Sequence, residues 1–186
     1  MKKIVLAITG ASGVMYGIRL LEELKKAGCI VYLIISESAK KIIEHETDYA
    51  AKDVVSLADE FFDEEDTFSK LASGSFQYDA AIIAPCSLKT LGAIANGYAN
   101  NLITRMAVCC LKEERKLILV PRETPLDLAS IENMIRAKRN GAIILPAMPA
   151  FYHHPKSIDD LVNYIVGKIL DSVGIEHSLV RRWEGK

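Results

Sequence analysis

The fold of this chain is constrained most by the regular alternation of short apolar segments with segments of helical periodicity. The apolar segments are continuous and rich in β-branched residues, which is typical of strands buried on both faces of a parallel sheet. After the last of them, apolar residues recur every three or four positions from Ile158 to Leu170. We therefore expect an α/β fold, a single doubly wound parallel sheet flanked by helices (Rossmann or flavodoxin-like), in one domain of residues 1–186. The expected strands are 4–8, 31–35, 80–84, 117–120 and 143–145.

Composition excludes several classes of protein. Half of the 186 residues are apolar and the formal net charge is −1, so there is no overall basic surface for nucleic acid or an anionic membrane. The apolar run at 4–8 is too short for a signal peptide, and no run is long enough to span a membrane. None of the four cysteines forms a Cys-x-x-Cys pair. We expect a cytoplasmic protein without a metal, and the slightly positive mean hydropathy favours a homo-oligomer.

Small and charged residues follow the predicted strands. In a parallel α/β sheet ligands bind beyond the carboxyl ends of the strands, and here those ends carry residues 10–13, Ser36, residues 85–87, Arg122 and Glu123. Small residues let backbone N–H groups approach a ligand, and the helix N-termini that follow favour anions. The glycine spacing of the first loop fits neither a dinucleotide fingerprint nor a Walker loop. The pattern therefore predicts a phosphate-bearing ligand without naming the reaction.

Three shorter patterns suggest other chemistries and are weaker. Tyr152 and Lys156 have the spacing of a short-chain dehydrogenase pair, but the proline between them breaks the helix that they would share. The acidic residues 63–66 resemble the magnesium-binding motif of diphosphate prenyl enzymes, yet no second such motif occurs and we expect solvated surface across 59–66. His153 and His154 are adjacent on an extended segment and point in opposite directions, so no metal site is expected there.

Eight short segments follow one another along the chain. They are residues 9–17 (TGASGxxYG), 46–48 (ETD), 85–91 (PCSxKTL), 100–105 (NNLIxR), 111–113 (LKE), 120–125 (VPRETP), 149–155 (PAFYHxP) and 182–183 (RW). No single segment is specific, but eight in this order are. From about residue 3 to residue 183 the chain resembles one known family, the flavin prenyltransferases of the UbiX type.

The resemblance implies one FMN-binding flavoprotein domain and a metal-independent reaction. The substrates would be reduced FMN and dimethylallyl monophosphate, and the product prenylated FMN, a cofactor for decarboxylases of the UbiD type. The family commonly assembles as a dodecamer with active sites at subunit contacts, so a homo-oligomer is implied as well.

The resemblance also implies roles for individual residues. Lys168 stands where the family often has Arg, and Lys keeps the charge but loses the bidentate geometry. Arg122 would lie at the FMN phosphate or between both ligands, and Trp183 could shield an allylic cation with its ring. The implied catalytic residues are Ser12, Glu46 and Glu123. The implied FMN contacts are Gly10, Ala11, Ser12, Ser36, Ser87, Leu88, Lys89, Thr90 and Arg122. The implied contacts to the prenyl phosphate are Arg105, Lys112, Arg122, Tyr152, Lys168 and Trp183.

These residue types suit the reaction. A monophosphate is a poor leaving group, and without magnesium its developing charge must be neutralised by cationic side chains. Glu123 could protonate the departing phosphate, and Ser12 could steer a proton at flavin N5 by hydrogen bonding. Each has a structural alternative, because Glu123 could balance a helix dipole and Ser12 could cap a helix.

Two other functions remain open at this point. An FMN-dependent cysteine decarboxylase would share the fold, but that group has a His in the first helix region and a Pro-Ala-Met-Asn motif. Here residues 13–20 contain no His, and Pro149 follows Pro146-Ala147-Met148. A flavin carrier subunit of a decarboxylase would not need the cations and Glu123, which point to a second, anionic substrate.

Overall fold

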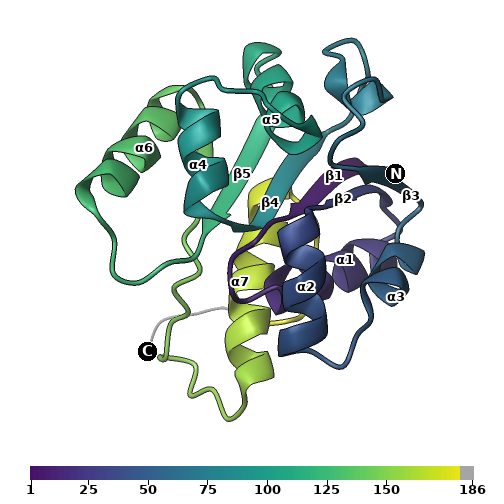
Figure 1. Ribbon diagram of the computed structural model, residues 1–186. Helices are drawn as coiled ribbons and strands as arrows, with labels where there is room; N and C mark the ends of the chain where they lie inside the picture. Colours follow the sequence, from purple (N-terminus) through teal and green to yellow (C-terminus); the bar gives the residue numbers. More distant parts are fainter. Residues whose placement is uncertain (181–186) are drawn as a thin grey trace.

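The computed structural model describes residues 1–180 and shows a six-stranded parallel sheet between two layers of helices (Figure 1). The strand order is β3-β2-β1-β4-β5-β6, so the predicted α/β fold is confirmed. The strands are β1 (Lys3–Ile8), β2 (Ile30–Ile35), β3 (Glu60–Asp63), β4 (Ala80–Cys86), β5 (Lys116–Pro121) and β6 (Ile143–Ile144). The helices are α1 (Met15–Lys26), α2 (Glu37–Glu46), α3 (Ala51–Ser56), α4 (Leu88–Ala95), α5 (Leu102–Lys112), α6 (Leu128–Arg139) and α7 (Ile158–Val173), with a 3₁₀ turn at Lys70–Ala72.

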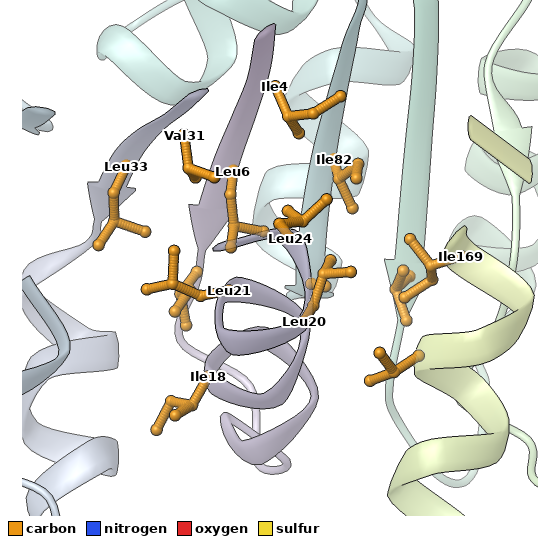
Figure 2. Close-up of a cluster of buried hydrophobic side chains, with 14 of the residues drawn as sticks. Ile4, Leu6, Ile18, Leu20, Leu21, Leu24, Val31, Leu33, Ile82 and Ile169 are labelled. Atoms are coloured by element: carbon orange, nitrogen blue, oxygen red, sulfur yellow. The ribbon is translucent and has the colours of Figure 1, made fainter. Parts of the chain in front are cut away.

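The continuous apolar pattern of the strands reflects burial on both faces. In β1, Ile4, Leu6 and Ile8 point to one core, which they share with α1, α2 and α7. Val5 and Ala7 point to the other core, which they share with α4 and α5. Alternation along the strand thus supplies both layers with apolar side chains. Figure 2 shows part of the first core, where side chains of α1 and α7 meet those of the strands.

Helix α7 confirms the helical stripe predicted for 158–170. Its buried residues include Ile165, Val166 and Ile169, and the helix packs beside α1. Ser157 begins it, since its hydroxyl accepts a hydrogen bond from the Asp160 N–H at 3.2 Å. Gly174 ends it in the left-handed conformation at φ 67°.

The strand order reverses between β1 and β4: β2 and β3 are added on one side of β1, and β5 and β6 on the opposite side of β4. The helix after β1 covers one face and the helix after β4 covers the other, and in sheets of this kind ligands bind at the carboxyl ends of such a strand pair. Thr9 joins the two strand ends: its hydroxyl donates to the Pro85 carbonyl at 2.8 Å and accepts from the Ser87 N–H at 2.8 Å. This switch point is where a ligand is expected.

The expectation of solvated surface across 59–66 is wrong in part. Strand β3 lies within this stretch at the edge of the sheet, and Phe62 is buried. Glu64 is only 9% exposed, because its carboxylate accepts from the Glu37 N–H at 2.6 Å and from Asn101 Nδ2 at 2.8 Å. Charged residues flank two phenylalanines here, so the sequence lacks the continuous apolar run by which the other strands were predicted. Glu65 and Asp66 are exposed, as expected.

All four cysteines are free and buried. Within residues 1–180, no helix has the length and apolar character needed to cross a membrane.

Candidate functional site

Three segments that are distant in the sequence converge beside the switch point. Arg122, just after β5, donates from Nε to the Ser12 carbonyl at 2.9 Å. Glu46, at the end of α2, accepts from the Gly13 N–H at 2.8 Å and from the Val14 N–H at 3.4 Å. The Ser12 side chain is also hydrogen-bonded to the Glu46 carboxylate. We call Ser12, Gly13, Glu46 and Arg122 the switch-point cluster.

Two glycines allow the loop between β1 and α1 to take this shape. Gly13 has φ +94°, a conformation that strains any residue with a side chain. A Cβ on Gly10 would lie 2.2 Å from Ser38 Oγ, so the loop can pack on α2 only without one. The close packing holds the loop in place and leaves its backbone near the crevice.

Hydrogen bonds and a neighbouring charge hold the Glu46 carboxyl in its ionised form. Burial alone would raise the pKa of its carboxyl, but hydrogen bonds from Ser12, Gly13 and Val14 and the charge of Arg122 together lower that pKa. The carboxylate is therefore ionised at neutral pH, and it takes the place of a side-chain cap at the start of α1. The ionised carboxylate beside Ser12 favours the orientation in which the serine hydroxyl donates to it.

The starts of α2 and α4 lie at the same edge of the sheet. Ser36 caps α2 by accepting from the Ala39 N–H at 3.2 Å, and Ser87 caps α4 by accepting from the Thr90 N–H at 3.2 Å. The Ser87 and Thr90 hydroxyls are also 3.0 Å apart. The FMN contacts predicted in these loops are thus brought to one edge with Gly10, Ala11 and Ser12.

A hollow of about 390 Å³ adjoins the start of α4. Its lining comes from α4, from the segment that follows it and from the first turn of α5. The lining residues are Leu88, Lys89, Thr90, Gly92, Ala93, Tyr98, Asn100, Asn101 and Thr104. Leu88, Lys89 and Thr90, all predicted FMN contacts, therefore face an open volume.

Tyr152 and Lys168, predicted to hold the prenyl phosphate, meet at a third residue that sequence reasoning missed. The Tyr152 ring packs edge-on against Tyr164, with centroids 6.1 Å apart at 83°. Lys168 Nζ lies 5.9 Å from the centroid of the Tyr164 ring. His153 stacks on Tyr164 at 5.4 Å and 5°. We call these four residues the Tyr164 cluster; the only sequence signal was the i, i+4 spacing of Tyr164 and Lys168.

Two predicted cations do not join either cluster within this chain. Helix α5 runs back from the carboxyl edge toward the amino edge, where β5 starts. Arg105 is exposed and its Nε donates to the Ala72 carbonyl at 3.2 Å. Lys112 is exposed at the far end of the helix and pairs with Glu113 at 3.3 Å.

Glu123 is next to Arg122, but its side chain is exposed and accepts from the Thr124 N–H at 3.0 Å. Trp183 lies outside the described residues.

His153 and His154 lie at different depths, the first half-buried and the second exposed. Within residues 1–180, no three His, Cys, Asp or Glu side chains are placed to hold a metal.

Comparisons with known proteins agree on one family. The sequence profile of the flavoprotein family matches residues 1–170. Flavin prenyltransferase UbiX of Methanothermobacter thermautotrophicus is 54% identical over 100% of this chain and 97% of its own. The structure of AnUbiX (PadA1) with FMN and dimethylallyl pyrophosphate has a TM-score of 0.98 at 42% identity, covering 100% of this chain and 98% of that one.

The comparisons also separate the alternatives. A dodecameric FMN-dependent UbiX-like decarboxylase from Escherichia coli O157:H7 has a TM-score of 0.96 at 45% identity, covering 98% of this chain and 100% of that one. The peptidyl-cysteine decarboxylase EpiD reaches a TM-score of 0.67 at 22% identity, covering 92% of this chain and 97% of its own, which shows a shared fold alone. The prenyltransferase interpretation is therefore favoured over the cysteine decarboxylase.

Proposed function

Because the chain belongs to the flavin prenyltransferases of the UbiX type, within the flavoprotein family, we propose that the site at the carboxyl ends of its parallel strands joins a dimethylallyl group from dimethylallyl monophosphate to reduced FMN. The chain is an enzyme of the prenyltransferase class, and FMN is its flavin. The convergence of Ser12, Glu46 and Arg122 at the switch point carries the proposal at the level of residues.

The residues at this edge fit FMN. Gly10 leaves room for close approach of the backbone, and the first turns of α2 and α4 present N–H groups and positive dipole ends to an anion. Arg122 adds a guanidinium suited to a phosphate. The hollow beside α4 offers a largely apolar wall, which includes Leu88, Gly92 and Ala93, for a flat ring system.

Bound reduced FMN would supply the nucleophilic N5 and C6 atoms that the new ring closes across. Ser12 would orient a proton at N5, because its hydroxyl is aligned by the ionised Glu46 carboxylate. Glu46 would accept that proton through Ser12. Glu123, on the loop of Arg122, would deliver a proton to the departing phosphate once a ligand draws it from its local bond to Thr124.

The Tyr164 cluster would bind the donor. Tyr152 is 47% exposed and Lys168 is exposed, so both side chains can contact a phosphate. The related AnUbiX structure contains dimethylallyl pyrophosphate, which supports a dimethylallyl phosphate as the donor class. That the donor carries a single phosphate is our proposal, and the test below compares the two forms.

We propose that neighbouring subunits complete the site. Arg105 and Lys112 are exposed on α5 and lie outside both clusters of their own chain, so they would serve an adjacent copy. The dodecameric relative from Escherichia coli supports a homo-oligomer, probed by its molar mass in solution. We also propose that the product passes to a UbiD-type decarboxylase and that the enzyme works in the cytoplasm, where its four free thiols would stay reduced.

The direct test uses anaerobically reduced, FMN-loaded protein. Dimethylallyl monophosphate or dimethylallyl pyrophosphate is added, and the flavin is released with acid and weighed by mass spectrometry. We expect the flavin to gain the mass of one C5 prenyl unit. We expect this reaction to be faster with the monophosphate than with the pyrophosphate. Unmodified FMN with both donors, with reduction verified, would contradict the proposed function.

A further inference from the structure

Tyr164, on α7, occupies the centre of the four-residue cluster and contacts each of the other three residues. Tyr152 packs its ring edge against Tyr164 at 6.1 Å, His153 stacks on it at 5.4 Å, and Lys168 Nζ lies 5.9 Å from its centroid. Tyr152 comes from the segment after β6, whereas Lys168 lies on α7 one turn after Tyr164. A single ring therefore joins two segments that each supply one predicted phosphate contact.

Tyr164 is fixed in place more firmly than the residues around it. Its neighbours Ile165 and Val166 are buried in the sheet core at 1% and 0% exposure, and Tyr164 itself packs against that core. Asn163 ties the same turn to α1 by accepting from Arg19 Nε at 2.9 Å. Tyr152, by contrast, is 47% exposed, and Lys168 is exposed. The ring is thus a fixed platform for two exposed side chains.

The chemistry of the ring suits that role. An ammonium within about 6 Å of an aromatic face is attracted to it, which restricts a lysine that otherwise samples many rotamers. Burial, then the nearby Tyr152 and its hydrogen bond, raise the pKa of the Tyr164 phenol, so the phenol stays neutral. It adds no negative charge beside a phosphate.

We propose that Tyr164 is a positioning residue that orients Tyr152 and Lys168 to bind the phosphate of the prenyl donor. The inference rests on the proposed function. Lys168 lacks the bidentate geometry of arginine. Contact with the Tyr164 ring would fix the direction of its side chain instead. Tyr164 acts on donor affinity through its neighbours and takes no part in the proton transfers.

The test compares Tyr164→Leu, Tyr164→Phe and the parent enzyme. Binding of dimethylallyl monophosphate is measured by calorimetry on FMN-loaded, oxidised protein, in which no turnover occurs; KM, kcat and FMN affinity are measured separately. Tyr164→Leu should raise the Kd and KM for the donor about tenfold, with kcat and FMN affinity unchanged. Tyr164→Phe keeps the ring and should stay within about threefold of the parent.

Two controls separate positioning from general damage to α7. Asn163→Ala removes the bond to Arg19 on the same turn and should leave donor affinity unchanged. In a Lys168→Ala background, Tyr164→Leu should cost less than in the parent, because part of its effect passes through the lysine.

Each remaining outcome decides the matter. A parent-like donor Kd for Tyr164→Leu, an equal loss in Asn163→Ala, or full additivity with Lys168→Ala would overturn the inference and leave the proposed function standing. A parent enzyme that binds no dimethylallyl phosphate would overturn the proposed function, and the inference with it.

Discussion

The switch-point cluster and the Tyr164 cluster are held together by different forces. At the switch point, a carboxylate and a guanidinium are fixed by hydrogen bonds of 2.8 and 2.9 Å to the backbone of a loop that cannot accept a Cβ at Gly10. Around Tyr164 on α7, contacts of 6.1 and 5.9 Å hold two exposed side chains, Tyr152 and Lys168. Directional polar contacts suit proton transfer, whereas broad aromatic contacts suit binding of a donor that arrives and leaves.

The largest effect is expected from Glu46→Gln, which tests whether chemistry belongs to the switch point. Gln keeps the shape but cannot take a proton, so kcat should fall by about a hundredfold to a thousandfold. The donor Kd should stay within about twofold, since the Tyr164 cluster is untouched. Steady-state kinetics and calorimetry check both, and a parent-like kcat would remove Glu46 from the chemistry.

A smaller loss of turnover is expected from Glu123→Gln. The variant should retain FMN binding but lose most of its turnover, by about tenfold to a hundredfold, because it cannot protonate the phosphate. Flavin fluorescence measures the first quantity and single-turnover kinetics the second. A rate equal to the parent's would show that the proposed acid is wrong and would leave Glu123 as the surface residue that its exposed position suggests.

Gly10→Ala tests whether the switch-point loop depends on close packing. The new Cβ would lie 2.2 Å from Ser38 Oγ, so the loop must shift, which should destabilise the fold by about 1–3 kcal/mol. Thermal unfolding measures the change. Gly92→Ala is the matched control, because its Cβ would meet only the Asn133 side chain at 3.3 Å and alanine favours a helix. Equal stability of both variants would contradict the packing argument.

The smallest effect concerns pH and Glu46. Its folded pKa lies below the ordinary value of 4.5, so the carboxylate contributes stability that is present above that value. The contribution is lost as the pH falls through the folded pKa. The side chain is exposed, so the effect is small. The stability difference between the parent and Glu46→Gln should therefore shrink on acidification, as measured by urea unfolding, and a growing difference would contradict the shift.

The two clusters also differ in how far the sequence predicted them. The strands and their small-residue ends follow from apolar runs, and the resemblance to UbiX-type enzymes supplied Ser12, Glu46 and Arg122. Their contact required the fold, since Glu46 reaches Gly13 from the end of another helix. Tyr164 was missed because its role depends on the phase of α7 against a loop with no periodicity. Strand β3 was missed because its four residues include two acids.

The proposed homo-oligomer would give a role to the two remaining predicted cations. Arg105 and Lys112 look like ordinary surface residues in their own chain, the first bound to a carbonyl and the second paired with Glu113. Sequence resemblance predicts a role for them, and the fold of the single chain gives them none. Residues that serve a neighbouring copy carry no local signal of burial or charge, so they can be recognised only through the assembly.

The division of labour between the clusters is tested most directly by one experiment on three proteins. The single-turnover rate constant for flavin prenylation and the donor Kd are measured side by side for the parent, Glu46→Gln and Tyr152→Phe. The account predicts that Glu46→Gln lowers the rate constant at an unchanged Kd, and that Tyr152→Phe raises the Kd at a nearly unchanged rate constant. The reverse assignment, or equal loss of both quantities in both variants, would contradict it.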